Sequence, residues 1–409
     1  MSSKTRRALA RAVAPLSAEQ FLAEHWERKP YVATRREPGR YDDLLSEEDV
    51  ERLVCSTGIR YPAFRLVKEG AKLDVADYTE DVPWRPSPFT GTANVERVLA
   101  EFEAGATIVL QGLHLHWPPL AAFCRDLEAE LGEPVQANAY YTPRGSQGLP
   151  VHHDTHDVLS LQVAGEKRWL VYEPAVELPL KDQRYRPELG DPGEPVHDVT
   201  IGPGDTLYLP RGWLHEARTS RTDSLHITVG VNVYTRLDAF RAAIDDCADD
   251  VEFRRAVGDE ALLEDDLLDR LRERLSSEDI ARRRRARFVK TRRAILEGQL
   301  RQLRGLDALT AETSVERRPT VIVDVSAGNG RVSLAFQGKE IAFPAHAREE
   351  IEYAASATSA FRPRDLPGDL DDESRVVLVR RLVLEGFLRV TEPGSRDRPS
   401  PRGGAAAEA

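Results

Sequence analysis

The sequence predicts a mixed α and β fold, in which a double-stranded β-helix of the jelly-roll type precedes a helical segment and a smaller winged-helix-like domain. Three observations support this fold class. From about residue 134 to 236, short segments rich in β-branched and aromatic residues alternate with Gly, Pro and Asp turns. From 237 to about 305, apolar residues recur at spacings of three and four with almost no Gly or Pro. After 319, a hairpin pattern is mixed with helical ones.

The first part of the chain predicts a helical preface to the barrel. Ser17 is a helix N-cap candidate, and the apolar residues after it fall on one helical face: Phe21, Leu22 and Trp26. Residues 47–54 and 94–103 predict further short helices. Residues 106–120 predict a buried strand that runs into a turn at Pro118-Pro119.

The barrel itself is predicted from five strand-like segments: "VQANAYYTP", "DVLSLQVAG", "KRWLVYEP", "HDVTIGPGDTLYLP" and "LHITVGVNVYT". A Pro- and charge-rich loop over 174–196 makes the longest break between them. Because many short strands follow one another without helices, we expect an antiparallel barrel or a double-sheet jelly roll. Together with its preface, this domain is expected to span residues 1–236.

The next segment, 237–310, is predicted to be helical and to carry a leucine stripe: Leu262, Leu263, Leu267, Leu268, Leu271 and Leu275. Such a stripe packs against another helix, either in the same chain or in a second copy of it, and we expect a homodimer. Residues 315–391 combine a hairpin around Gly328-Asn329-Gly330 with two helical patterns, which indicates the winged-helix-like domain. The composition of 392–409 is typical of a disordered tail.

Composition narrows the classes of function. With 41% hydrophobic and 31% charged residues, the chain resembles an ordinary globular protein. It has no run of about 18 apolar residues and no apolar signal-peptide core near its start, so we expect a cytoplasmic location. The net charge of −11 argues against a wholly basic nucleic-acid binder. Cys55, Cys124 and Cys247 are far apart and predict neither disulfides nor a thiolate metal site.

The stretch "PVHHDTHD", residues 150–157, concentrates candidate metal ligands. In a strand, His152 and Asp154 point to one face and His153 to the other. An imidazole and a carboxylate on one face supply two ligands of a 2-His-1-carboxylate site. The third candidate is His215, which follows the Pro-Arg-Gly turn 61 residues after Asp154. The alternative is a cluster of surface histidines at a strand end.

The other two histidines of this stretch are not predicted to bind the metal. His153 lies on the wrong face and His156 too far along the chain, so we expect both to lie beside the site or at the surface.

Three protein ligands leave three positions open on an octahedral Fe(II), enough for two oxygens of a 2-oxo acid and for dioxygen. Imidazole and carboxylate without thiolate suit iron or manganese better than structural zinc. A 2-oxo dicarboxylic acid also requires a cation for its far carboxylate, and Lys167 follows a turn 15 residues after His152. On spacing alone, an exposed turn lysine is the simpler interpretation of Lys167.

Residues 138–174, 204–217 and 21–32 together resemble the ribosomal oxygenase group of JmjC proteins, which are cupin-fold protein hydroxylases that use Fe(II), 2-oxoglutarate and O2. The resemblance extends to the order of barrel, helical dimerisation segment and winged helix. It implies that His152, Asp154 and His215 bind the metal and that Lys167 binds 2-oxoglutarate. It further implies that three more residues line the active site: Asn138, Tyr140 and Thr228.

Two departures from the family pattern stand out. The family has an aromatic residue between the first two ligands and a proline before them, where this chain has His153 and Val151. Because position 153 faces away from the metal, we expect the chemistry to survive. The family also often has a small hydroxyl residue two positions after Thr228, where this chain has Gly230.

By this resemblance, the substrate is a His or Arg side chain of a ribosomal protein, hydroxylated at its β-carbon with release of succinate and CO2. The same site could instead hydroxylate a free amino acid or a peptide natural product, or demethylate a histone. An alternative of another class is a winged-helix nucleic-acid-binding regulator with an inactive barrel. It relies on the basic stretch 281–293, for which a solvated helix face is the simpler interpretation.

Overall fold

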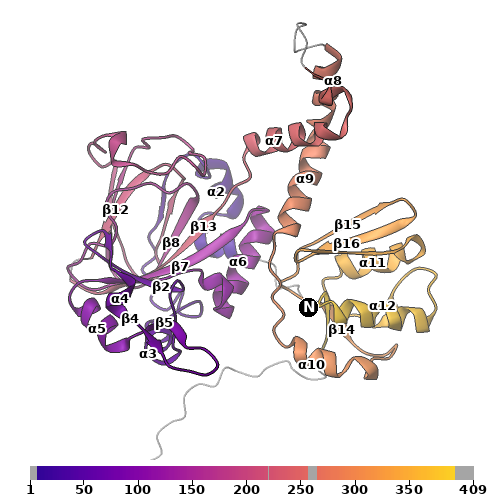
Figure 1. The fold of residues 1–409 in the computed structure, drawn as a ribbon, viewed down its shortest axis with the longest axis horizontal. Helices are drawn as coiled ribbons and strands as arrows, with labels where there is room; N and C mark the ends of the chain where they lie inside the picture. Colours follow the sequence, from indigo (N-terminus) through magenta and orange to yellow (C-terminus); the bar gives the residue numbers. More distant parts are fainter. Residues whose placement is uncertain (1–6, 220, 257–264, 392–409) are drawn as a thin grey trace, which may run out of the picture. The chain divides into compact units, whose positions relative to one another are not determined.

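The computed structural model describes residues 7–219, 221–256 and 265–391 (Figure 1). The chain divides into two compact units between Thr235 and Arg236. The predicted tail and two residues of the predicted stripe, Leu262 and Leu263, lie outside the described residues. No helix in the described part is long and apolar enough to cross a membrane.

The first unit is a double-stranded β-helix, and the strands predicted over 134–236 are confirmed. In the described residues its larger sheet has eight antiparallel strands, in the order β1 (Tyr31–Ala33), β11 (Thr206–Leu209), β8 (Asp157–Gly165), β13 (Ser224–Val231), β7 (Val135–Thr142), β6 (Thr107–Leu110), β2 (Phe64–Lys68) and β3 (Ala71–Lys72). The smaller sheet has the order β10 (His197–Ile201), β9 (Lys167–Tyr172) and β12 (Leu214–Arg218). A separate hairpin joins β4 (Thr79–Val82) to β5 (Phe89–Ala93).

In the described part of the first unit, six α-helices flank these sheets: α1 (Ala8–Val13), α2 (Ala18–Glu24), α3 (Glu47–Ser56), α4 (Val75–Tyr78), α5 (Val95–Glu103) and α6 (Pro118–Leu131). The predicted N-cap is confirmed, because Ser17 and Gln20 form a reciprocal capping box at the start of α2. The predicted turn at Pro118-Pro119 is wrong, because the two prolines begin α6. The first turn of a helix needs no amide donors, so proline is favoured there.

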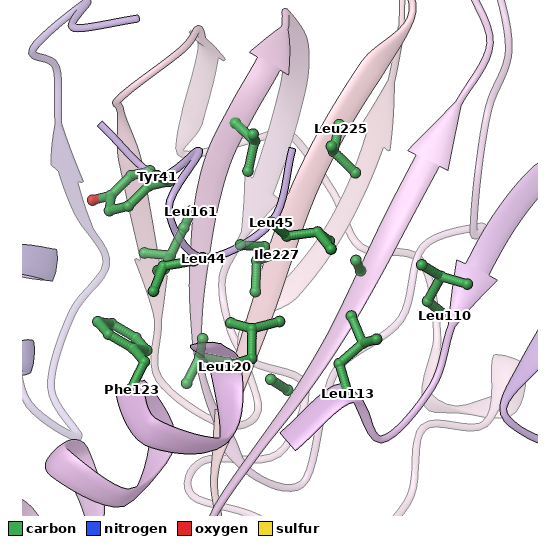
Figure 2. Close-up of a cluster of buried hydrophobic side chains, with 14 of the residues drawn as sticks. Tyr41, Leu44, Leu45, Leu110, Leu113, Leu120, Phe123, Leu161, Leu225 and Ile227 are labelled. Atoms are coloured by element: carbon green, nitrogen blue, oxygen red, sulfur yellow. The ribbon is translucent and has the colours of Figure 1, made fainter. Parts of the chain in front are cut away.

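The main core lies between α6 and one face of the larger sheet. Leu120 and Phe123 of α6 face Leu161 of β8 and Ile227 of β13 (Figure 2). Burying each such side chain stabilises the fold by roughly 1.5–3 kcal/mol. On β13 the core side chains alternate with those of the other face. His226 and Thr228 therefore point away from α6.

The second unit begins with α7 (Arg236–Asp246), α8 (Asp265–Arg274), α9 (Ser277–Lys290) and α10 (Gln299–Arg304). The prediction of helix through to 305 is wrong between Lys290 and Gln299, where the chain leaves the helix. The described members of the leucine stripe are half-buried: Leu267, Leu268, Leu271 and Leu275.

The rest of this unit packs two helices, α11 (Arg348–Ser356) and α12 (Asp372–Leu384), with the sheet β15 (Val323–Gly328), β16 (Arg331–Phe336) and β17 (Lys339–Pro344). A further pair joins β14 (Val315–Arg317) to β18 (Leu388–Val390). The predicted hairpin is confirmed, because Asn329 and Gly330 have φ values of 50° and 71° and join β15 to β16. The three cysteines are free thiols, as expected.

Candidate metal centre

The structure brings His152, Asp154 and His215 together. One ligand atom from each lies within 4.8 Å of the others. Nε2 of His215 is 3.8 Å from Oδ2 of Asp154, and the two imidazole ring centroids are 4.4 Å apart. This cluster is therefore one site and not a set of surface histidines.

Backbone pairing places these three residues. His152 N–H donates to the carbonyl oxygen of His215 at 3.1 Å, and His215 N–H donates back to that of His152 at 2.8 Å. Gly212 N–H donates to the carbonyl of Asp154 at 3.0 Å. The prediction that His152 and Asp154 lie in a regular strand is wrong, because this segment forms one isolated bridge to β12 and β8 begins only at Asp157. The two side chains nevertheless share a face, as predicted.

Both imidazoles are oriented by carbonyl groups of their own loops. Nδ1 of His152 lies 2.7 Å from the carbonyl oxygen of Pro150, and Nδ1 of His215 lies 3.0 Å from that of Trp213. Because a carbonyl can only accept, each Nδ1 carries a hydrogen, and Nε2 is the ring nitrogen left to bind a metal. Such hydrogen bonds fix the tautomer of metal-binding histidines.

The electrostatics of the cluster favour metal binding. Burial raises the pKa of Asp154, but the imidazoles of His156, His215 and their neighbours outweigh it and hold that pKa below its usual value. Burial lowers the pKa of His215 to about 4. An ionised Asp154 beside a neutral His215 is a protonation state that suits a divalent metal.

The three ligand candidates line a cavity of about 60 Å³ between the two sheets. Lys167 and Trp169 reach it from β9, and Tyr140 and Thr228 reach it from the larger sheet. The cavity therefore continues from the metal candidates to a set of polar side chains inside the barrel.

Lys167 is a buried member of this cavity and is only 3% exposed. Its Nζ donates to Oγ1 of Thr142 at 3.0 Å. Burial lowers the pKa of Lys167 to about 7. The interpretation of Lys167 as an exposed turn residue is therefore wrong, and a buried amine that donates to a neutral hydroxyl is suited to an anionic ligand.

Of the three further residues predicted to line the active site, two line this cavity and one does not. Tyr140 lines the cavity, stacks on His226 with ring centroids 5.1 Å apart, and has its pKa raised to about 12 by burial. Thr228 also lines the cavity. Asn138 is not among the lining residues, and its side chain instead accepts a hydrogen bond from Gly112 N–H at 2.9 Å.

His153 lies away from the metal candidates, as the alternation predicts. It is buried, its Nε2 lies 3.0 Å from the carbonyl oxygen of Gln183, and its ring packs edge-on against Tyr185. His153 therefore fastens the 174–196 loop instead of contributing a ligand.

His156 is half-exposed and lies against Gly230, where a Cβ would come within 2.4 Å of the imidazole Cδ2. The imidazole thus occupies the space that a side chain at position 230 would need.

His226 lines the cavity and is 3% exposed, although it is not among the site residues predicted from the sequence. The strand alternation could have found it, because it lies two positions before Thr228 on the same face of β13.

Comparison with known proteins agrees with this geometry. Residues 116–238 match the family model described as JmjC domain. The bifunctional lysine-specific demethylase and histidyl-hydroxylase NO66 of Drosophila persimilis is 33% identical over 227 residues, 55% of this chain and 31% of that protein. Residues 116–238 of this chain are thus similar to JmjC domains. Ribosomal oxygenase 2 of Rattus norvegicus is 34% identical over 225 residues, 53% of this chain and 45% of that protein. The chain thus spans less than half the length of these curated relatives.

The fold of the chain is similar to that of a solved ribosomal oxygenase. The crystal structure of Escherichia coli ribosomal oxygenase YcfD matches 92% of this chain and 98% of its own, with a TM-score of 0.55 and 20% identity. YcfD in complex with cobalt and 2-oxoglutarate matches 91% of this chain and 98% of its own, with a TM-score of 0.54 and 18% identity. These likenesses show a common fold.

Proposed function

We propose that this protein is an Fe(II)- and 2-oxoglutarate-dependent dioxygenase that hydroxylates a protein side chain. The observation that carries the proposal is that His152, Asp154 and His215 line the same cavity as the buried amine of Lys167. Neither part alone would indicate this reaction class. A metal site and an anion site inside one barrel together match a metal-bound 2-oxo dicarboxylic acid.

The donor set fits Fe(II). Two imidazoles and one carboxylate with open positions suit a non-haem iron, and no thiolate lines the cavity to favour zinc or copper. When bound, the iron would supply the oxygen chemistry: O2 oxidises 2-oxoglutarate to succinate and CO2, and its second oxygen atom enters a substrate C–H bond.

The chain's own residues bind and orient the cosubstrate. Lys167, held by Thr142, pairs as an ammonium with the far carboxylate. The phenol of Tyr140 stays protonated because its pKa is raised to about 12, so it can donate a hydrogen bond to that carboxylate. Trp169 covers an apolar side of the cavity and keeps water out.

Two further residues complete the cosubstrate side in this proposal. The hydroxyl of Thr228 lines the cavity. Asn138 pairs with Thr228 across β7 and β13, and its hydrogen bond to Gly112 gives it a supporting position.

For the substrate, we propose a His or Arg side chain of a ribosomal protein. The support is the names of the relatives, which include ribosomal oxygenase 2 and a histidyl-hydroxylase. A cytoplasmic enzyme would meet this substrate on ribosomes or on newly made ribosomal proteins. A free amino acid and a peptide natural product remain alternatives for the same chemistry.

The alternative of a nucleic-acid-binding regulator is less well supported. Several arginines of the basic stretch on α9 already pair with acidic residues: Arg282 with Asp279, Arg283 with Asp246, and Arg285 with Asp324. This pairing favours a solvated helix face over a phosphate-binding one. A barrel without activity would also have no need of the buried Lys167.

We further propose that the second unit forms a homodimer and that residues 315–391 are a winged-helix-like domain. On α7, three apolar side chains spaced three and four residues apart are 40%, 50% and 56% exposed: Leu237, Phe240 and Ile244. An apolar helical stripe left open in one chain is suited to a second copy of the same helix. Multi-angle light scattering would show twice the monomer mass, and a monomer at micromolar concentration would refute the dimer.

The experiment that tests the function is turnover of 2-oxoglutarate by the purified protein with Fe(II), O2 and isolated ribosomal subunits. We expect succinate release that rises when subunits are added, and one added oxygen atom on a His- or Arg-containing peptide. Oxygen added to free amino acids but not to subunits would favour the small-molecule alternative. No succinate under any of these conditions would refute the dioxygenase.

A further inference from the structure

The two segments that carry the candidate ligands meet again behind the metal centre. Arg211 lies in the turn four residues before His215, and Asp157 lies three residues after Asp154. Nη1 of Arg211 donates to Oδ2 of Asp157 at 3.1 Å. Arg211 is 6% exposed and Asp157 is fully buried. A buried ion pair thus joins the segment that carries His152 and Asp154 to the turn that precedes His215.

The helical preface closes this pair from the other side. Nη1 of Arg211 also forms an ion pair with the carboxylate of Glu27, which follows α2. Tyr208 donates its hydroxyl hydrogen to Oδ1 of Asp157 at 2.8 Å and accepts one from Glu27 N–H at 2.9 Å. The Tyr208 ring packs against Phe21 of α2, with centroids 4.8 Å apart. Asp157 therefore has a charged partner on one oxygen and a neutral one on the other.

The same turn holds the backbone of a ligand directly. Gly212, next to Arg211, donates its N–H to the carbonyl of Asp154 at 3.0 Å. Its φ of +92° is a conformation that side chains disfavour, and a Cβ there would lie 2.2 Å from the carbonyl oxygen of Val176. The turn is thus fixed on three sides: by Arg211, by its bond to Asp154 and by the loop around Val176.

We propose that Arg211, Asp157, Glu27 and Tyr208 form a latch that positions the metal ligands, so that the helical preface is a working part of the metal centre. This proposal rests on the metal-binding role assigned above. None of the four residues lines the cavity with the ligands, so each acts through the backbone and not by contact with the metal. Buried charges that lose a partner disturb their surroundings strongly, which makes the latch sensitive to single substitutions.

The test measures Co(II) binding to the full chain by isothermal titration calorimetry, together with the melting temperature of the metal-free protein. We expect Arg211→Met to weaken Co(II) binding at least about tenfold, the effect typical of losing a group that orients metal ligands. Arg211→Lys keeps the charge but replaces the planar guanidinium, whose Nη1 contacts both Asp157 and Glu27, and is expected to fall between Arg211→Met and the unchanged protein.

The matched control is Arg125→Met. Arg125 forms an ion pair with Glu128 at 3.2 Å, both side chains are only 6% exposed, and both lie on α6, which covers the core face of the larger sheet. We expect this substitution to lower the melting temperature while Co(II) binding changes less than about twofold. A purely structural role of Arg211 would make the two variants behave alike.

Wild-type Co(II) affinity in folded Arg211→Met, or an equal loss of affinity in Arg125→Met, would overturn the latch. Should Arg211→Met not fold, Glu27→Gln decides, because the Glu27 side chain is 35% exposed and its loss leaves Asp157 paired. That variant is expected to weaken Co(II) binding measurably, and unchanged affinity would refute the proposal. If the unchanged protein itself fails to bind Co(II), it is the proposed metal site that is wrong.

Discussion

His152 and His215 pair through both of their backbone amides, at 3.1 and 2.8 Å, although they lie far apart in the sequence. This pairing sets their ring centroids 4.4 Å apart before any metal binds. The backbone therefore preorganises two of the three candidate ligands. A preformed site of this kind loses little entropy on binding its metal.

Replacement of any one metal candidate should abolish both binding and turnover. His152→Ala or Asp154→Ala leaves two protein ligands, too few to hold Fe(II) with a 2-oxo acid. We expect Co(II) affinity to fall by at least about a hundredfold and succinate production to be lost. Calorimetry and a succinate assay measure the two effects, and full turnover in either variant would refute the assignment.

His153→Ala should leave the metal site intact and loosen a loop. His153 faces away from the ligands, and its contacts are the carbonyl of Gln183 and the ring of Tyr185. We expect Co(II) affinity within about twofold of wild type, but faster amide hydrogen exchange across 174–196 because these contacts are lost. His152→Ala is the matched comparison, with the opposite pattern. Loss of metal binding in His153→Ala would contradict the predicted alternation.

Lys167 should give the metal-free protein an unusual pH dependence. Its pKa is about 7 in the folded state, against about 10.4 when unfolded. Between these values the unfolded chain holds a proton that the folded chain has lost, so the free energy of unfolding rises with pH. Urea unfolding at pH 7 and pH 9 would measure this rise.

Lys167→Met should lack that rise and should be more stable than wild type at pH 7, by an amount on the order of a few kcal/mol. The exposed Lys72 offers a control, since Lys72→Met should keep the wild-type pH dependence. Equal pH profiles for wild type and Lys167→Met would show that Lys167 is not the buried titrating group.

The same group should make cosubstrate binding depend on pH. The ammonium form of Lys167 pairs with a carboxylate, so binding above pH 7 requires uptake of a proton. We expect the affinity of the Co(II)-loaded protein for 2-oxoglutarate to fall about tenfold per pH unit above pH 7. Calorimetry in buffers of different ionisation enthalpy would count the proton. An affinity that is constant from pH 7 to pH 9 would argue against the pairing.

Gly230→Ala should destabilise the barrel because it displaces His156. A Cβ at this position would come within 2.4 Å of the imidazole. We expect a loss of about 1–3 kcal/mol in the free energy of unfolding, typical of overpacking. The double variant with His156→Ala should recover most of it, since the smaller side chain leaves room. Additive losses in the double-mutant cycle would show that the two residues do not share this space.

The sequence by itself was enough to predict much of the barrel and the outline of the site. Strand composition and turns predicted β7 to β11 and β13, and alternation separated His152 and Asp154 from His153. The strand predictions hold because a half-buried strand repeats every two residues whatever its partners are. His152 and Asp154 share a face although their segment forms only an isolated bridge to His215. Where local patterns competed, the prediction was wrong: Pro118 begins a helix instead of a turn, and the chain leaves the helix after Lys290.

The tertiary structure decided what no local pattern encodes. Spacing favoured an exposed Lys167, yet the fold buries it against Thr142, because burial depends on which strands close the barrel. Two more contacts join residues that are distant in the sequence: His156 packs against Gly230, and Arg211 pairs with Asp157. The candidate metal ligands could thus be predicted from the sequence. The residues that contact and position the site could not, because they come from distant parts of the chain.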